Sequence, residues 1–220
     1  MKESAAALKE FLNDFIGHVA PGTVLLGSLF ILFEWPFEVA AEFASSVTFL
    51  VLAIAACFAA GHAMSALHAA FLPILKRVWL AVDEAEWERN LESSGQAQRA
   101  QAALGAPNSL KGRSLRSELM TLSPQAKDLA VRFQHVSLLY TGVAMSLWSA
   151  GACRVYAYLL SPKLLRVAPT ALDLAVQSAV VLLIGAAALW KAKEFHARSL
   201  RVPFTAGVAE INDRNRLSTK

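Results

Sequence analysis

Long stretches without Asp, Glu, Lys or Arg alternate with polar segments along the chain. Four of them are about as long as a membrane-spanning helix, at residues 15–33, 43–75, 133–153 and 174–190. A helix that crosses the hydrocarbon core of a bilayer needs about 20 predominantly apolar residues. The pattern therefore predicts an all-α integral membrane protein, with four transmembrane helices packed as a bundle.

The residues before the first stretch follow the pattern of a surface helix. Leu8, Phe11, Leu12 and Phe15 recur at the i, i+3, i+4, i+7 spacing, and polar residues lie opposite them. This predicts an amphipathic helix over residues 1–17 that lies in the membrane interface. Pro21-Gly22 is expected to break or bend the chain just inside the first span.

The second stretch is longer than a bilayer requires. Its 33 residues would extend about 50 Å as a helix, against a hydrocarbon core of about 30 Å. The helical pattern continues beyond Lys76, and Ser123-Pro124 is a typical N-cap and first position for a helix entering the third span. We therefore predict a cytoplasmic helical hairpin over residues 76–132 that extends two membrane helices.

The basic residues predict the orientation. No Lys or Arg lies between the first two spans, whereas the segment 76–132 holds nine and the tail 191–220 holds seven. Cytoplasmic loops of membrane proteins are enriched in these residues. We expect spans one and two over residues 18–75, spans three and four over 133–190, a basic cytoplasmic tail, and both termini in the cytoplasm. The size and alanine-rich composition suggest a bacterial inner (plasma) membrane.

Composition agrees with a membrane location and argues against a nucleic-acid partner. The chain is 55% hydrophobic and 17% charged, with a mean hydropathy of +0.43, whereas soluble domains are nearer 25% charged. The net charge is +4, but the basic residues lie beside the apolar stretches and form no stripe with aromatic residues.

Small residues recur every fourth position in the second stretch. They are Ala53, Cys57, Gly61, Ser65 and Ala69. Such a small-residue ridge lets another helix backbone approach closely. The sequence therefore predicts a helix-packing ridge on this span.

Histidines form the candidate intramembrane polar site. At 100° per residue, His62 and His68 lie about 120° apart and flank the ridge. His18 and His135 stand at the cytoplasmic starts of the first and third spans. Histidines in a bundle can hold a haem or a metal, but they also hydrogen-bond carbonyls across helices. Because no matched His pair is present, we predict no cofactor and no metal.

Three acidic residues form an outward acidic face between the first two spans. Glu34, Glu38 and Glu42 have i, i+4, i+8 spacing. They could collect cations at the mouth of a channel. Ion pairs with Arg154, Lys163 and Arg166, which lie on the same side, are the interpretation we favour.

No motif indicates a reaction. The four stretches hold no charged residue of the kind that coupled transporters place at mid-membrane, and hydrolase and P-loop motifs are absent. We expect a non-enzymatic interaction scaffold: a membrane subunit, sensor or membrane-perturbing effector of a larger assembly. Its expected partners are the lipid bilayer, copies of itself or another membrane complex, and a cytoplasmic protein bound at residues 76–132.

Two alternatives stay open. The first is an oligomeric channel or transport component, whose lining could come from the polar residues Ser65, His68, Thr141, Ser146, Ser149 and Gln177. The second is a haem or metal redox membrane protein that uses the histidines.

Overall fold

The computed structural model describes residues 2–34, 46–105, 110–165 and 169–218, with side chains from residue 15 to residue 217. Every regular element within these ranges is helical, and no strand occurs among them. The four long helices are α1 (Lys2–Leu32), α3 (Val47–Arg77), α7 (Pro124–Leu160) and α8 (Ala171–Val202). The shorter ones are α4 (Glu84–Ser93), α5 (Gln96–Leu104), α6 (Gly112–Leu122), η1 (Pro162–Leu164), η2 (Pro203–Gly207) and α9 (Val208–Ser218).

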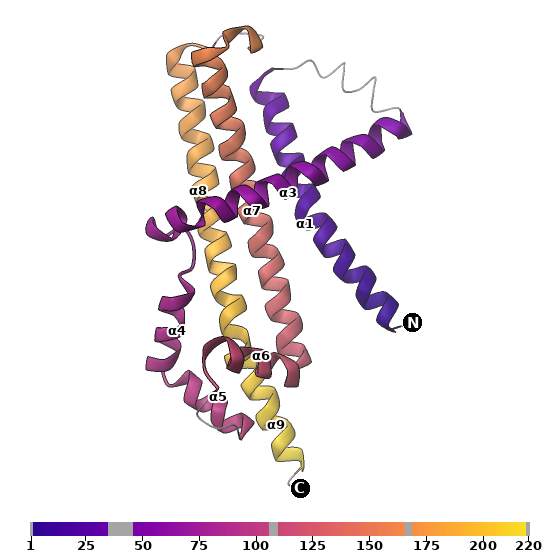
Figure 1. Cartoon of the computed structure of the whole chain (residues 1–220), viewed down its shortest axis with the longest axis vertical. Helices are drawn as coiled ribbons and strands as arrows, with labels where there is room; N and C mark the ends of the chain where they lie inside the picture. The colour runs from indigo at the N-terminus through magenta and orange to yellow at the C-terminus, as the bar shows by residue number, and fades with distance from the viewer. Residues whose placement is uncertain (1, 35–45, 106–109, 166–168, 219–220) are drawn as a thin grey trace.

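Helices α7 and α8 form an antiparallel pair that makes the long axis of the molecule (Figure 1). The Ser137 hydroxyl donates a hydrogen bond to the carbonyl of Ala192 at 2.8 Å. Nearer the other end, the Trp148 indole donates to the Leu182 carbonyl at 3.3 Å. Gly185 makes room for this ring, since a Cβ there would lie 2.1 Å from Trp148 Nε1. The pair is therefore joined by polar contacts as well as by apolar packing.

Helix α1 packs against both α3 and α7. It runs through Pro21-Gly22 without interruption, so the expected break between an interfacial helix and a first span is not observed. Both residues are buried, and the Pro21 ring packs against Gly142 of α7. The Ser146 hydroxyl donates to the Pro21 carbonyl at 2.7 Å. These contacts on a close-packed face hold the helix together where proline removes a backbone donor.

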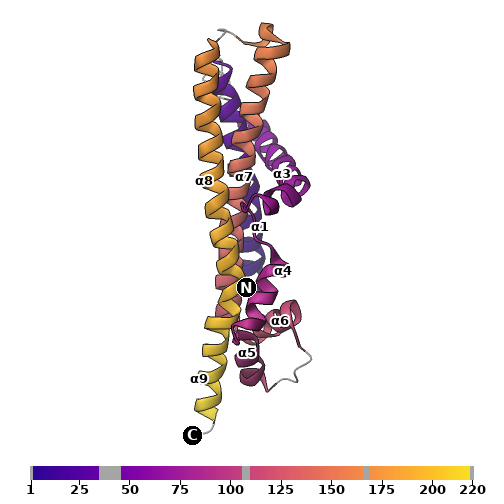
Figure 2. The ribbon, with the colours of Figure 1, turned by 90° about the vertical axis from the view of Figure 1, so that its left-hand side faces the viewer.

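Helix α3 crosses the α7–α8 pair obliquely instead of running parallel to it (Figure 1; Figure 2). It ends at Arg77, where the chain turns at Trp79 with a left-handed φ of 64°. The expected continuation of this helix into residues 76–132 is therefore wrong. Residues other than glycine rarely adopt this left-handed backbone conformation, and here Trp79 adopts it just after the end of the helix.

The segment between α3 and α7 holds three short helices rather than two helical extensions. Helices α4, α5 and α6 form a cluster with η2 and α9, which continue the chain after α8. Their shared core contains Leu91, Ala100, Leu115, Leu119, Phe204 and Ile211, among others. The expected start of α7 is confirmed: Ser123 caps the helix by accepting a hydrogen bond from Ala126 N–H, and Pro124 is its first residue.

The C-terminal residues continue α8 as a long helical rod instead of forming a separate tail (Figure 2). Helix α8 passes into a π-helical turn at Pro203–Gly207 and then into α9. Proline 203 has no N–H to donate to the preceding turn, which favours a local change of helical pitch. The rod carries Phe204 and Ile211 into the core of the short helices.

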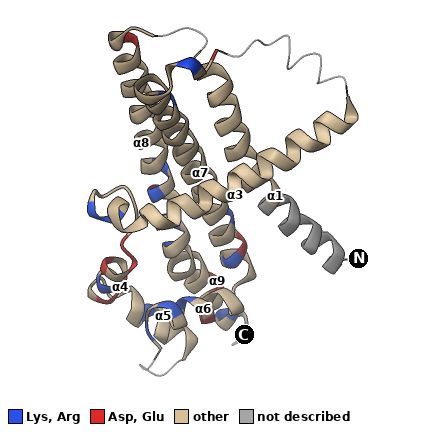
Figure 3. Cartoon of the chain, turned by 45° about the horizontal axis from the view of Figure 1, so that its top comes forward, with Lys and Arg blue, Asp and Glu red and all other residues tan. Residues whose placement is uncertain are grey.

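Within the described residues, four helices are long and apolar enough to cross a membrane, as the sequence predicts. Large apolar side chains stand exposed along them, including Leu52 at 63% and Leu183 at 70%. Charged side chains gather on the short helices and the adjoining helix ends, whereas most of α3 has none (Figure 3). This division is the one expected of a multi-pass membrane protein.

Candidate functional site

The candidate site lies where the end of α3, the start of α4, the first half of α7 and the last half of α8 meet. Arg77 and Asp83 bound the connection between α3 and α4, and Asp83 caps α4 by accepting a hydrogen bond from Ala85 N–H at 3.1 Å. Lys193 of α8 donates to the Trp79 carbonyl at 2.9 Å. Its ammonium lies 5.6 Å from the ring centres of both Trp79 and Trp190. The turn after α3 is therefore attached to α8 by one hydrogen bond and one cation–π contact.

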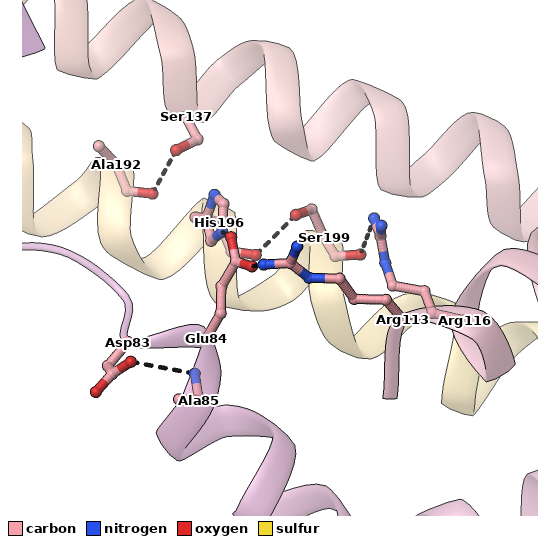
Figure 4. Close-up of polar contacts among 9 residues, drawn as sticks. All are labelled: Asp83, Glu84, Ala85, Arg113, Arg116, Ser137, Ala192, His196 and Ser199. Carbon is pink, nitrogen blue, oxygen red and sulfur yellow. Dashed lines mark hydrogen bonds and ion pairs between the residues drawn. The ribbon is translucent and has the colours of Figure 1, made fainter. Parts of the chain in front are cut away.

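Glu84, in the first turn of α4, lies at the centre of a charged cluster (Figure 4). Arg113 of α6 donates a hydrogen bond to its carboxylate. His196 Nε2 of α8 lies 3.9 Å from the Glu84 carboxylate. One acidic side chain thus joins two short helices to a long helix that is apolar enough to cross a membrane.

Arg116 of α6 extends the cluster along α8. It donates to the Ser199 carbonyl at 3.4 Å, and the Ser199 hydroxyl donates to the His196 carbonyl at 2.7 Å (Figure 4). Arg116 Nε is buried and has no hydrogen-bond partner among the described residues. Burial lowers the pKa of Arg116 below its usual value, while the nearby Glu84 carboxylate acts in the opposite direction. The guanidinium still remains charged at physiological pH.

Two adjoining cavities open at this junction. The smaller, of about 160 Å³, is lined mainly from α3, α7 and α8, and its polar wall includes His68, Lys76, Gln134, Lys193 and His196. The larger, of about 300 Å³, lies toward the short helices. Glu84, Gln134 and His196 line both cavities. The junction is thus a space with both apolar and polar walls, between the long helices and the short-helix cluster.

Comparisons with protein-family models, curated proteins and solved structures give no match. The candidate site is therefore defined by this chain's own geometry.

The small-residue ridge of α3 lies partly against α1. A Cβ on Gly61 would lie 1.8 Å from the His18 carbonyl oxygen, and one on Gly22 would lie 1.7 Å from that of Cys57. Cys57 and Gly61 are thus at the crossing of the two helices. Ala53 and Ser65 are half-buried, and Ala69 is exposed.

The structure brings His18 and His62 together across this crossing. Their rings stack with centroids 3.7 Å apart and an interplanar angle of 20°. The Ser65 hydroxyl lies 3.4 Å from His18 Nδ1, and Phe58 packs edge-on against both imidazoles. His18 is half-buried and His62 is exposed, so the two imidazoles contact each other at the edge of the helix crossing and line none of the cavities described above.

The other two candidate histidines lie elsewhere. His68 points toward the junction, where it lines the smaller cavity with His196. His135 is half-buried on α7. Among the described residues, no group of three or more His, Cys, Asp or Glu side chains is placed to hold a metal ion.

One acid of the outward face, Glu34, is paired. Its carboxylate lies 3.5 Å from Arg154, whose side chain is only 4% exposed. Glu38, Glu42 and Arg166 lie outside the described residues, and Lys163 is exposed in η1. For Glu34, the geometry is that of an ion pair rather than of an open acidic surface.

Three of the polar residues considered for a channel lining, Ser65, Ser146 and Ser149, take part in contacts between or within helices. The buried Oε1 of Gln177, by contrast, has no hydrogen-bond partner among the described residues. Ser146 donates to the carbonyls of Pro21 and Gly142, and Ser65 donates to the Gly61 carbonyl. Ser149 contacts the Met64 sulfur at 3.4 Å, while Thr141 is buried and also lines the smaller junction cavity. Side chains with such partners contribute to helix association.

Sequence reasoning missed the central members of the junction: Glu84, Arg113, Arg116, Lys193 and His196. They come from α4, α6 and α8, and each lies in a segment whose charges look like an ordinary solvated surface. One available signal was the position of Lys193 beside Trp190, since basic and aromatic residues together mark the end of an apolar span.

Proposed function

We propose that this chain is a non-enzymatic, multi-pass membrane protein that serves as a membrane subunit or sensor of a larger assembly. In this proposal the short helices α4–α6 and both termini lie in the cytoplasm. A cytoplasmic partner binds the short helices, and the long helices respond to that binding. The bacterial plasma membrane is the location that the composition favours.

One observation carries the proposal: the core of the short-helix cluster is built on the continuation of α8. Phe204 and Ile211, from η2 and α9, pack with Leu115 and Leu119 of α6. Glu84 adds a second connection, because it contacts both Arg113 and His196. A force applied to α4–α6 would therefore act directly on α8, since close-packed interfaces transmit small displacements.

The distribution of charge supports the proposed orientation. Residues 76–132 and 191–220 together hold 16 of the 21 Lys and Arg residues. The connection between α7 and α8 lies at the opposite end of the molecule from the short helices (Figure 1; Figure 3). An excess of Lys and Arg marks the cytoplasmic side.

The proposal can be tested by photo-crosslinking from the full-length chain in living cells. A photoreactive amino acid replaces Arg89, an exposed residue of α4, and in a matched variant it replaces Leu183, an exposed apolar residue of α8. We expect position 89 to give a discrete adduct with a protein, while position 183 gives lipid adducts or dimers of this chain.

Absence of a protein adduct from position 89 and from a second exposed position, Arg99 of α5, would contradict a partner on the short helices. A protein adduct from position 183, with none from position 89 or position 99, would place the partner within the membrane instead.

A further inference from the structure

The smaller junction cavity has an excess of positive charge. Lys76 and Lys193 line it with the single carboxylate of Glu84. That carboxylate is already engaged by Arg113 and faces His196. An anion entering this space would therefore meet two ammonium groups and one partly neutralised acid.

These cations lack acidic partners of their own. Within the described residues, Lys76 has no hydrogen bond and no ion pair, and Lys193 donates only to the Trp79 carbonyl. On the neighbouring cavity wall, Arg116 donates to the Ser199 carbonyl, and its buried Nε has no hydrogen-bond partner in the described part of the chain. Buried or half-buried cations are normally paired, because removing a charge from water costs free energy.

Further donors surround the two lysines. The imidazoles of His68 and His196 and the Gln134 amide line the same cavity. The volume of about 160 Å³ is below the range of about 300–1,000 Å³ typical of pockets for drug-sized ligands. The space suits a compact anion that accepts several hydrogen bonds, which a phosphate group does.

We propose that this cavity binds a phosphate group between Lys76 and Lys193, and that its occupation regulates the coupling between the short helices and α3 and α8. The inference rests on the proposed function, in which this junction transmits a signal at the cytoplasmic side of the membrane. The phosphate belongs either to an anionic lipid headgroup or to a water-soluble phosphate compound. Both sources present the same chemistry, and the experiment separates them.

Bound phosphate would add a polar connection between elements that now meet through the Trp79 turn, through Glu84 and through the apolar cluster that holds Leu75 and Leu189. Lys76 is in the last turn of α3, whereas Lys193 and His196 are on α8. An anion between them would draw the end of α3 toward α8. It would also compete with Glu84 for His196, which loosens the contact of α4 with α8. Binding and the position of α4 are therefore linked.

The test uses full-length protein purified in a neutral detergent, with thermal unfolding as the measurement. In one arm the probe is inorganic phosphate against sodium chloride of equal ionic strength. In the other arm the probe is phosphatidic acid in mixed micelles against phosphatidylcholine. A ligand that binds the folded state raises the unfolding midpoint as its concentration increases.

We expect at least one probe to raise the midpoint of the natural protein. Lys76→Gln should weaken the apparent affinity about tenfold, as expected for loss of one charge-assisted hydrogen bond. Lys76→Arg should retain most of the effect. The matched control Arg89→Gln removes one positive charge from an exposed position that lines neither junction cavity, and it should respond like the natural protein.

A higher unfolding midpoint with inorganic phosphate would identify the ligand as a water-soluble phosphate compound. A higher midpoint with phosphatidic acid alone would identify it as a lipid headgroup. No shift with either probe, or equal shifts for Lys76→Gln and Arg89→Gln, would overturn the proposal. If Lys76→Gln does not fold, His68→Gln on the same cavity wall replaces it in the comparison. The purified protein contains no cytoplasmic partner. A failure to bind phosphate in this test would therefore leave the crosslinking test of the proposed function unaffected.

Discussion

At the residue scale, glycine positions control how closely the long helices approach. Gly61 and Gly22 bring the backbones of α3 and α1 into direct contact, and Gly142 receives the Pro21 ring from α1. Gly17 and Gly27 also lie on α1, and among the residues that the structure describes no atom comes within 4 Å of a Cβ built on either of them. The contrast identifies which glycines are required by packing and which are not.

Gly61→Ala should destabilise the crossing of α1 and α3. The new Cβ would lie 1.8 Å from the His18 carbonyl oxygen, which is backbone and cannot rotate away. Separation of the helices would also disturb the stacking of His18 on His62. We expect a loss of about 1–3 kcal/mol, the usual cost of overpacking, measured as a lower thermal unfolding midpoint in detergent.

Gly27→Ala is the control for this substitution. It makes the same chemical change in the same pair of helices, at a position with open space around it. Its midpoint should equal or exceed that of the natural protein, because alanine favours helix more than glycine does. Equal midpoints for the Gly61 and Gly27 variants would contradict the close crossing.

At the element scale, the local signals of the sequence were informative, whereas most contacts between distant segments were not predicted. The four apolar stretches and the Ser123-Pro124 helix start are each encoded within a few turns, and the structure confirms them. The end of α3 depends on a left-handed Trp79 whose carbonyl is bonded by Lys193, 114 residues away. No local sequence pattern indicates such a contact, so the sequence could not predict where α3 ends.

The same reason explains the missed junction. Glu84, Arg113 and His196 come from α4, α6 and α8, and the tertiary fold brings them together rather than their spacing along one helix. By contrast, the ion pair favoured for the outward acids required only that two segments lie on one side of the membrane. Glu34 and Arg154 are 3.5 Å apart.

Ser123 connects three elements and provides a test of their coupling. It is fully buried, caps α7 through Ala126 N–H, and its hydroxyl donates to the Glu210 carboxylate of α9. Ser123→Ala should therefore cost more than the loss of a helix cap alone, which is about 1 kcal/mol. We expect the free energy of unfolding to fall by about 2 kcal/mol, as measured from the thermal unfolding midpoint of the full-length protein.

Thr121→Ala serves as the matched hydroxyl deletion, because Thr121 is exposed and bonds only within α6, to the Ser117 carbonyl. Its midpoint should change little. If both variants lost the same stability, the contact between Ser123 and Glu210 would contribute nothing to the packing of α9.

At the scale of the whole molecule, the short helices gather at one end of the α7–α8 pair and the connection between these two helices lies at the other end (Figure 1). Helix α3 ends at the basic residues Lys76 and Arg77, from which the chain leads into α4 and the other short helices (Figure 1). Such separation of charge between the two ends defines an orientation in a membrane.

This orientation can be tested by thiol labelling of the full-length chain in intact cells. Cys57 and Cys153 are first replaced by serine, and a single cysteine is then placed at Lys163 in η1 or at Arg89 in α4, both exposed positions. A membrane-impermeant maleimide should label Lys163→Cys from outside, whereas Arg89→Cys should react only after the membrane is opened. The reverse pattern would place the short helices outside the cell and would exclude a cytoplasmic partner at α4–α6. Labelling of both positions in intact cells would show that α7 does not separate η1 from the short helices across a membrane.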